Sequence, residues 1–350
     1  MRPLVYIVTT GWLLLYLGCQ SPSESFSPPL WTFRTHVPVG FIHPIDADKL
    51  GVKSADTYYI LNKFDGQIMD QIPLGNVGLA GILYDNHRIY YGSSHNTFQC
   101  YDLEGREAIW TFQTGSENQA TPVDDGQKVY WGSADSSVYA VDKQTGALQW
   151  KFTTGSHIYA TPVWVDSLLL IGSWDTGLYA FHRETGKELW KFQAETAVTQ
   201  KPLLFKQTVW LPCYDSHIYG IDRFRGELVF DFAADNAFEF GGVRWRDTLI
   251  FTGIDRNLYF VDPLGKAVTV KGKFPVAIST RPVIRDGILI SGHYDGSLYL
   301  WDLLTMQKRL LYRFDERVLT VWVDERYLWA SSWDRTTLCF ALESITEQQM

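Results

Sequence analysis

The side chains that could do chemistry are spread thinly along the chain. A metal site needs His or Cys ligands that cluster or recur at short spacings. Five of the eight histidines lie far apart in different repeat units, at His95, His157, His182, His217 and His293. Three of the four cysteines, Cys100, Cys213 and Cys339, are also far apart in the sequence. No Ser-His-Asp arrangement can be recognised in the sequence. The glycines lie in turns and not ahead of a helix, so they do not indicate a phosphate-binding loop. We therefore expect no catalytic residue, no metal ligands and buried free thiols.

The fourth cysteine, Cys19, directly follows an apolar segment. Residues 4–18 are mostly apolar, and Arg2 is the only charge before Cys19. Such a run is too short to span a membrane and is typical of a secretory signal peptide. Leu17-Gly18-Cys19 resembles a bacterial lipobox, in which the cysteine is lipidated, although Tyr16 stands where that motif usually has leucine. The sequence therefore predicts lipidation of Cys19, with a plain signal peptide or an uncleaved anchor as alternatives.

The residues after Cys19 indicate how the rest of the chain is organised. The segment is rich in Ser and Pro, as expected of a semi-extended tether. We expect four parts: a signal peptide (1–18), a tether (19–30), a folded domain (31–342) and a C-terminal tail (343–350). This organisation predicts a protein of the bacterial cell envelope held by lipidated Cys19, or otherwise one that is soluble in the periplasm or secreted.

The folded domain is an array of repeats. A step of 40 residues connects one column of aromatic positions: Tyr59, Gln99, Tyr139, Tyr179, Tyr219, Tyr259, Tyr299 and Cys339. Each unit holds four strand-length segments with alternating apolar residues, bounded by Gly and Asp turns. Four short strands in each unit of this length form the blade of a propeller. We therefore expect an all-β, eight-bladed β-propeller of four-stranded blades, and a monomer.

A second column of large rings begins before any strand of the first unit. It contains Trp31, Trp110, Trp150 and Trp190, which we expect to act as structural locks within the blades. Because Trp31 precedes its own blade, the simplest closure places this N-terminal strand in the last blade, beside Cys339. The ring then has no open sheet edge.

Residue volumes in two columns change in opposite directions. Small residues accompany large rings, as in Ala140 with Trp150, Ala180 with Trp190 and Gly220 with Phe230. Larger residues accompany smaller partners, as in Phe260 with Val270 and Leu300 with Leu310. Because interiors are densely packed, we expect each of these pairs to be in contact. Ile60 and Asp70 of the first unit do not follow the pattern.

The repeat resembles a known family at the motif Y-A-x-D-x-x-T-G-x-x-x-W. Residues 139–150 match it fully, and residues 179–190 match except for His182. This motif resembles the pyrroloquinoline-quinone-type propeller repeat, which implies a turn tied by Asp and Thr and a Trp stacked over the small residue. With a lipobox-like cysteine and eight units, the chain is similar to the lipoprotein B subunits of the outer-membrane β-barrel assembly machinery. This resemblance implies a role in outer-membrane protein assembly and a place on the periplasmic side of the outer membrane, through lipidated Cys19. The last two units also resemble WD repeats.

The functional alternatives are a scaffold, an enzyme and a ligand sensor. Quinone-dependent dehydrogenases with this repeat are longer, with inserted loops and commonly an adjacent Cys–Cys pair, whereas here the 280 residues from Tyr59 to Cys339 contain seven regular steps. The net charge of −8 disfavours nucleic acid. We therefore expect a non-enzymatic scaffold without a cofactor, bound to envelope proteins and to the membrane through its lipid. A quinone-dependent enzyme and a propeller that senses a small molecule are the alternatives.

One rim of the ring is the candidate binding site. Turns between the second and third strands carry Asp135, Asp175, Asp215, Asp255 and Asp295. The links into the next blade lie on the same face and hold Glu117, Glu195, Asp235 and Glu316. Asp is common in turns for conformational reasons alone, but the links contain Glu as well. We expect an acidic rim that binds a basic partner, with Tyr159 and Phe238 as exposed aromatic contacts. Arg256, Arg317 and Arg335 are the basic exceptions on this face.

Overall fold

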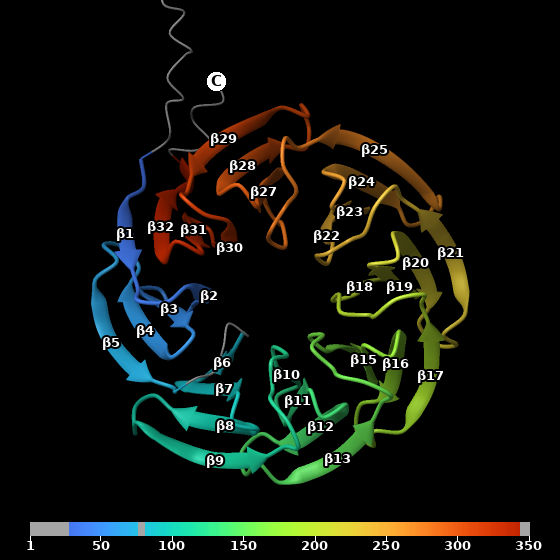
Figure 1. Ribbon diagram of the computed structural model, residues 1–350, viewed down its shortest axis with the longest axis horizontal. Coiled ribbons are helices and arrows are strands. Elements are labelled where there is room, and N and C mark those ends of the chain that lie inside the picture. The colour runs from blue at the N-terminus through green and yellow to red at the C-terminus, as the bar shows by residue number, and fades with distance from the viewer. Residues whose placement is uncertain (1–27, 76–80, 344–350) are drawn as a thin grey trace, which may run out of the picture.

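The structure, a computed structural model, describes residues 28–75 and 81–343, and these form a closed ring of eight antiparallel four-stranded sheets (Figure 1). The predicted fold class is confirmed. The signal peptide, Cys19, most of the tether and nearly all of the C-terminal tail lie outside the described residues. Within the described ranges, no helix is both long and apolar enough to cross a membrane.

The first four blades follow one another along the chain, each with its first strand nearest the centre of the ring (Figure 1). Blade 1 contains β2 (Val39–Pro44), β3 (Lys49–Ser54), β4 (Thr57–Asn62) and β5 (Ile68–Pro73). Blade 2 contains β6 (Leu83–Asp85), β7 (Arg88–Gly92), β8 (Thr97–Asp102) and β9 (Glu107–Gln113). Blade 3 contains β10 (Val123–Asp124), β11 (Lys128–Gly132), β12 (Ser137–Asp142) and β13 (Leu148–Thr153). Blade 4 contains β14 (Val163–Val165), β15 (Leu168–Gly172), β16 (Gly177–His182) and β17 (Glu188–Gln193).

The remaining blades complete the ring. Blade 5 contains β18 (Leu203–Phe205), β19 (Thr208–Pro212), β20 (His217–Asp222) and β21 (Leu228–Ala233). Blade 6 contains β22 (Val243–Trp245), β23 (Thr248–Thr252), β24 (Asn257–Asp262) and β25 (Ala267–Lys273). Blade 7 contains β26 (Val283–Arg285), β27 (Ile288–Gly292), β28 (Ser297–Asp302) and β29 (Lys308–Arg313). Blade 8 combines β30 (Val318–Val323), β31 (Tyr327–Ser332) and β32 (Thr336–Ala341) with the N-terminal strand β1 (Trp31–Arg34).

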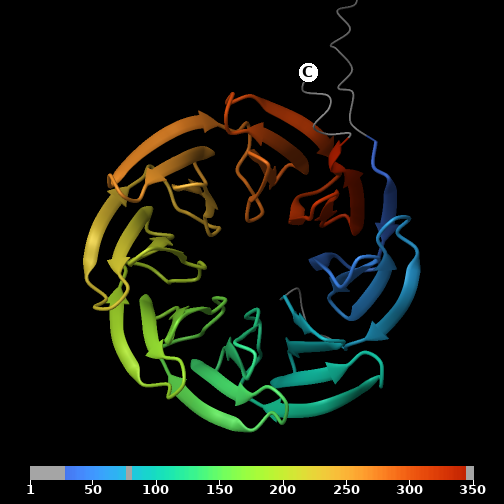
Figure 2. The same ribbon diagram turned by 180° about the vertical axis from the view of Figure 1, so that it is seen from behind.

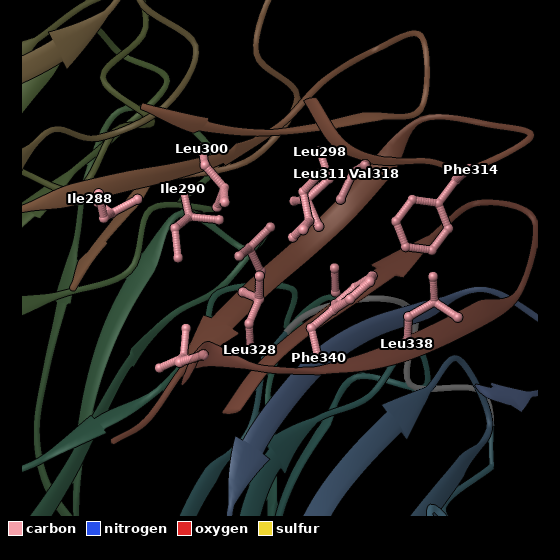
Figure 3. Packing of buried hydrophobic residues seen from close by; sticks show 13 residues of the cluster. Ile288, Ile290, Leu298, Leu300, Leu311, Phe314, Val318, Leu328, Leu338 and Phe340 are labelled. Atoms are coloured by element: carbon pink, nitrogen blue, oxygen red, sulfur yellow. The ribbon is translucent and has the colours of Figure 1, made fainter. Parts of the chain in front are cut away.

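The ring closes within blade 8, as the sequence predicts. Strand β1 runs antiparallel to β32, and Trp31 lies opposite Cys339. The same closed disc is seen from the other side in Figure 2. Apolar side chains fill the spaces between neighbouring blades. Figure 3 shows one such core between blades 7 and 8, where Leu298, Leu311 and Phe340 are almost fully buried.

The two columns of compensating volume meet in only part of the ring. Ala140 faces Trp150 and Ala180 faces Trp190, as expected. In blade 6, however, Phe260 faces Thr269, and in blade 7 Leu300 faces Arg309, so the predicted contacts of Phe260 with Val270 and of Leu300 with Leu310 are wrong. The reason is the position of the register shift, which comes after the small residue in blades 3–5 but before the corresponding residue in blades 6 and 7.

The tryptophans of the second column join neighbouring blades. The indole N–H of Trp150 in blade 3 donates to the carbonyl of Arg183 in blade 4, at 2.9 Å, and the ring covers Gly186. A Cβ atom on Gly186 would lie 2.5 Å from the Trp150 ring, and its φ of +68° also favours glycine. Corresponding bonds run from the other three locks: Trp31 to Lys63, Trp110 to Lys143 and Trp190 to Arg223.

The residue beneath each lock position depends on the residue that the preceding blade supplies there. Where the preceding blade supplies tryptophan, the turn has glycine, as at Gly66, Gly146, Gly186 and Gly226. Blade 1 supplies Asp70 instead, and the matching position in blade 2 is Arg106, which also has a positive φ. The Arg106 guanidinium pairs with the Asp70 carboxylate at 2.5 Å. An ion pair therefore occupies the place of the aromatic lock, which accounts for the irregular first unit.

Candidate functional site: the link face

We name the two faces of the disc by their loops. The link face carries the turns between the second and third strands and the links from each outer strand to the next blade. The turn face carries the two other turns of each blade. The acidic residues that the sequence predicts as a rim lie on the link face.

The turn aspartates of the link face are tied into the fold. Asp135 accepts the N–H of Gly115 in the preceding link at 2.8 Å and the Tyr139 hydroxyl at 2.5 Å. Burial alone would raise the pKa of this carboxyl, but the hydrogen bonds from Tyr139 and Gly115 hold it below its usual value. Asp175 repeats the arrangement with Gly155 and Tyr179. These aspartates stabilise the join between neighbouring blades and are not free to bind a partner.

The link acids lie closer to solvent. Glu195, Asp235 and Glu316 are exposed, and Glu117 is half-buried. Glu117 lies beside Tyr159, where burial and the nearby carboxylate raise the pKa of the phenol. Tyr159 is half-buried and its ring meets the Trp174 ring edge-on, with centroids 5.6 Å apart.

The prediction that Phe238 is an exposed contact is wrong. Its side chain is fully buried and packs edge-on against Tyr259, at a centroid distance of 5.2 Å. It belongs to the apolar core between blades 5 and 6, with Trp210 and Phe251. The sequence pattern misleads here because the link residue that enters a blade turns inward, whereas its neighbours remain on the surface.

Four other aromatic residues supply the exposed apolar surface of this face. Each directly precedes the acidic residue of a turn: Trp174, Tyr214, Tyr294 and Trp333. Their exposed fractions range from 37% for Tyr294 to 49% for Trp174. The 40-residue step could have identified the first three. The residue before the acidic turn position, which is His95 in blade 2, is Ser94 in blade 2 and Ala134 in blade 3 but aromatic in blades 4, 5 and 7. We call these four residues the aromatic crescent.

The backbone holds the aromatic crescent against the links. The Trp174 N–H donates to the carbonyl of His157 at 2.9 Å, and the Trp333 N–H donates to that of Arg317 at 2.9 Å. The Arg317 guanidinium lies over the Trp333 ring, 4.5 Å from its centre. Each ring therefore stands beside a link, next to the acidic side chains that the links carry.

Acidic side chains lie between the rings of the crescent. The Tyr294 hydroxyl donates to the Glu239 carboxylate, with distances of 2.7 and 2.6 Å to its two oxygens. Burial and the charge of Glu239 raise the pKa of Tyr214. Glu316 and Trp333 line a cavity of about 450 Å³ where blade 8 meets the start of blade 1. The result is an arc of blades 4–8 on which exposed rings alternate with carboxylates.

The central channel contains a second concave site. A cavity of about 750 Å³ is lined mainly by apolar residues of blades 1, 5, 6, 7 and 8, among them Phe240, Leu319 and Trp322. Its polar groups include the guanidinium of Arg281, which donates to the Gly242 carbonyl at 3.2 Å. Loss of contact with water lowers the pKa of the Arg281 guanidinium. Burial and the positive charge of Arg281 lower the pKa of Lys201.

Comparison with known proteins assigns the family. A family model described as outer membrane protein assembly factor BamB matches residues 56–161 and 134–348. The chain belongs to this BamB family. No curated protein sequence matches it significantly.

Solved structures agree with the fold of the BamB family. BamB from Moraxella catarrhalis is 16% identical with a TM-score of 0.73, and the match covers 90% of this chain and 99% of that one. The computationally designed Ika8 protein is 17% identical with a TM-score of 0.79, over 90% and 100%. Sqt1 from Saccharomyces cerevisiae is 11% identical with a TM-score of 0.78, over 91% and 99%. At these identities the matches establish the fold.

The family's repeat is named for a quinone, so we tested whether the channel fits one. The cavity lining contains no carboxylate, whereas the quinone of such dehydrogenases is accompanied by a carboxylate-bound calcium ion. Among the residues that the structure describes, no group of three or more His, Cys, Asp or Glu side chains could hold a metal ion. The described residues do not fit a calcium-bound quinone, and we derive no chemistry through one.

Proposed function

We propose that this BamB-family chain is a non-enzymatic lipoprotein of the bacterial envelope and a protein-interaction scaffold in outer-membrane protein assembly. Cys19 holds it to the periplasmic side of the outer membrane. The observation that carries the proposal is the aromatic crescent, where large rings remain exposed beside carboxylates. Exposed aromatic residues with little conformational freedom are the usual centres of protein-binding sites.

The chemistry of the link face selects the partner. Carboxylates of Glu195, Asp235 and Glu316 favour a basic segment, and the rings between them favour apolar side chains. The turn aspartates do not contribute to this binding, because their carboxylates accept hydrogen bonds within the fold. We therefore propose an envelope protein that presents a segment both basic and apolar.

The binding experiment uses detergent-solubilised envelopes and the anchored protein as bait. Changing Glu195, Asp235 and Glu316 to Lys should slow association and remove its salt dependence, because a one-signed rim steers a basic partner. Trp174→Ser with Trp333→Ser should accelerate dissociation without a large loss of thermal stability, because both rings are substantially exposed. Capture of outer-membrane assembly proteins by the wild type supports the proposal.

The matched control reverses three exposed acids of the turn face, Glu104, Glu227 and Glu325, to Lys. It alters the net charge of the whole protein by the same amount. Equal losses of binding in the two triple variants would contradict a partner site on the link face. Binding that changes neither with salt nor in either triple variant would contradict it as well.

The anchor has its own test. Cys19→Ser should move the protein from the membrane fraction to the soluble envelope fraction. A Cys19→Ser protein that keeps its full signal peptide and still partitions with membranes would contradict lipidation of Cys19.

The channel cavity favours a second candidate, a propeller that senses a small molecule. Its size suits a drug-sized ligand, and apolar walls with a few cationic groups are typical of such sites. Native mass spectrometry of the purified protein measures this directly. A stoichiometric ligand that is lost on Arg281→Gln would favour the second candidate over the scaffold.

A further inference from the structure

Exposed apolar residues also occupy the tips of the turn face. The tip between the third and fourth strands recurs every 40 residues, at Phe64, Glu104, Gln144, Glu184, Phe224, Leu264 and Leu304. The apolar tips are strongly exposed: Phe224 at 62%, Leu264 at 59%, Leu304 at 65% and Phe64 at 49%. They belong to blades 5, 6, 7 and 1, whereas blades 2, 3 and 4 carry polar tips. Apolar tips are therefore confined to one arc of the ring, which we call the apolar arc.

Backbone hydrogen bonds hold these tips in place. The carboxylate of Asp222 accepts the N–H of Phe224 at 2.9 Å, and that of Asp262 accepts the N–H of Leu264 at 2.9 Å. Asp302 does the same for Leu304. Because the aspartates bind the backbone of the turn, the apolar side chains are presented outward on a rigid loop.

Blade 8, which lies between blades 7 and 1, completes the apolar arc with the start of the folded chain (Figure 1). Strand β1 begins at the turn face, because Leu30 donates its N–H to the Cys339 carbonyl at 2.7 Å and Trp31 bonds to Lys63. Leu30 is itself 53% exposed. The predicted tether therefore joins the propeller on the same face as the apolar tips and within their arc.

Basic side chains stand beside the tips. Arg223 and Arg225 flank Phe224, and the Arg223 guanidinium lies 4.7 Å from the centre of the Phe224 ring. Lys266 and Lys308 follow the tips of the next two blades. Single apolar side chains next to Lys and Arg suit the boundary between lipid headgroups and acyl chains.

We propose that the apolar arc is a membrane-contact surface, whose tips enter the headgroup region of the bilayer to which the tether leads. The occupant is a lipid surface. The 12 residues of the predicted tether, 19–30, could extend roughly 40 Å, so the tether permits many orientations of the disc. The tips select one of them, with the turn face on the membrane and the link face toward the periplasm. Only this final orientation relies on the proposed anchor.

The test places an environment-sensitive fluorophore on one tip of the full-length protein. The described native cysteines are buried, so Leu264→Cys offers the label an exposed thiol. Glu104→Cys places the same label on a polar tip, and Leu148→Cys places it on an exposed apolar residue of an outer strand outside the arc. Each protein is mixed with vesicles of phosphatidylethanolamine and phosphatidylglycerol, with and without a headgroup-attached quencher. Melting temperatures verify that all three variants are folded.

The expected result is a blue shift and quenching of the label at position 264, with neither change at positions 104 and 148. This result supports the proposal whether or not the protein is anchored. Vesicle-bound protein whose label at 264 remains in water would overturn it, as would an unchanged label with excess vesicles. A shift that requires added envelope protein would overturn the assignment of lipid. Failure of lipidation would instead appear in the fractionation of Cys19→Ser, which the label does not measure.

Discussion

Acidic residues on the link face have two physical roles that residue type alone does not separate. Asp135 and Asp175 each accept hydrogen bonds from a tyrosine of their own blade and from a glycine of the preceding link. Glu195 and Glu316 are exposed instead. Substituting the hydrogen-bonded aspartates would disturb the join between blades. Substituting the exposed glutamates would change the electrostatic field around the link face. The structural and binding contributions can therefore be measured apart.

Two buried histidines make the stability of the protein depend on pH. His293 is fully buried, and its Nδ1 lies 2.9 Å from the Val276 carbonyl while Nε2 lies 3.0 Å from the Ser291 hydroxyl. The carbonyl can only accept, so Nδ1 carries a proton. Burial lowers the pKa of His293 to about 4, and that of His43 also to about 4.

The folded state resists protonation of these rings, so the unfolded state binds more protons between pH 6.5 and about 4. We predict that the free energy of unfolding is highest above pH 6.5 and falls as the pH decreases to about 4, by roughly 3 kcal/mol for each histidine. Urea denaturation at several pH values measures this slope. His293→Gln should make it shallower, and an unchanged slope would show that His293 is not the titrating group.

At the scale of elements, the joins between blades depend on a ring and the space beneath it. Trp150 reaches across to Gly186 and to the Arg183 carbonyl of the next blade. His182, which replaces the motif aspartate in that turn, bonds to the Thr185 hydroxyl through Nδ1 at 3.3 Å. The turn thus keeps its shape with a different side chain.

The glycine beneath the ring gives a direct test of this join. We predict that Gly186→Ala destabilises the protein more than Gly126→Ala. Both positions have a positive φ, which costs an alanine about 1–2 kcal/mol, but only Gly186 lies under a ring, whereas nothing lies within 4 Å of a Cβ at Gly126. Thermal or urea unfolding measures both. Equal losses would mean that the Trp150 ring moves aside without cost.

At the scale of the whole molecule, one blade differs from the other seven. Blade 8 is assembled from the two ends of the folded chain, and the pairing of β1 with β32 closes the ring. Every other blade is a continuous segment. Loss of β1 would expose the edge of β32 to other chains, since an unpaired strand edge promotes association.

Closure can be tested by comparing two tryptophans with the same local contacts. Trp31→Ala and Trp190→Ala each remove a buried indole that covers a glycine and donates to a carbonyl of the next blade. Each should cost about 3–5 kcal/mol. We predict that only Trp31→Ala also releases β1, which limited proteolysis near residues 28–38 and size-exclusion chromatography would detect as cleavage and association. Identical cleavage of the two variants would contradict the prediction that Trp31→Ala alone releases β1.

The sequence by itself determined the number of blades, their strand order and the closure by Trp31. These features follow from turn and strand patterns within each 40-residue unit, whose contacts are local and recur eight times. The link acids Glu195, Asp235 and Glu316 could likewise be placed on one face, because every link occupies the same position in its unit. Regular repetition makes such positions readable without any knowledge of packing.

Only the tertiary structure decided how the blades meet. Phe238 is buried because the link residue that enters blade 6 turns inward. Val270 faces away from Phe260 because a single-residue shift of register reverses the side that a strand presents. The fit of Trp150 over Gly186 joins two units through packing that neither unit specifies alone. The aromatic crescent and the apolar arc exist for the same reason: ring closure brings single residues from separate units onto one face of the molecule.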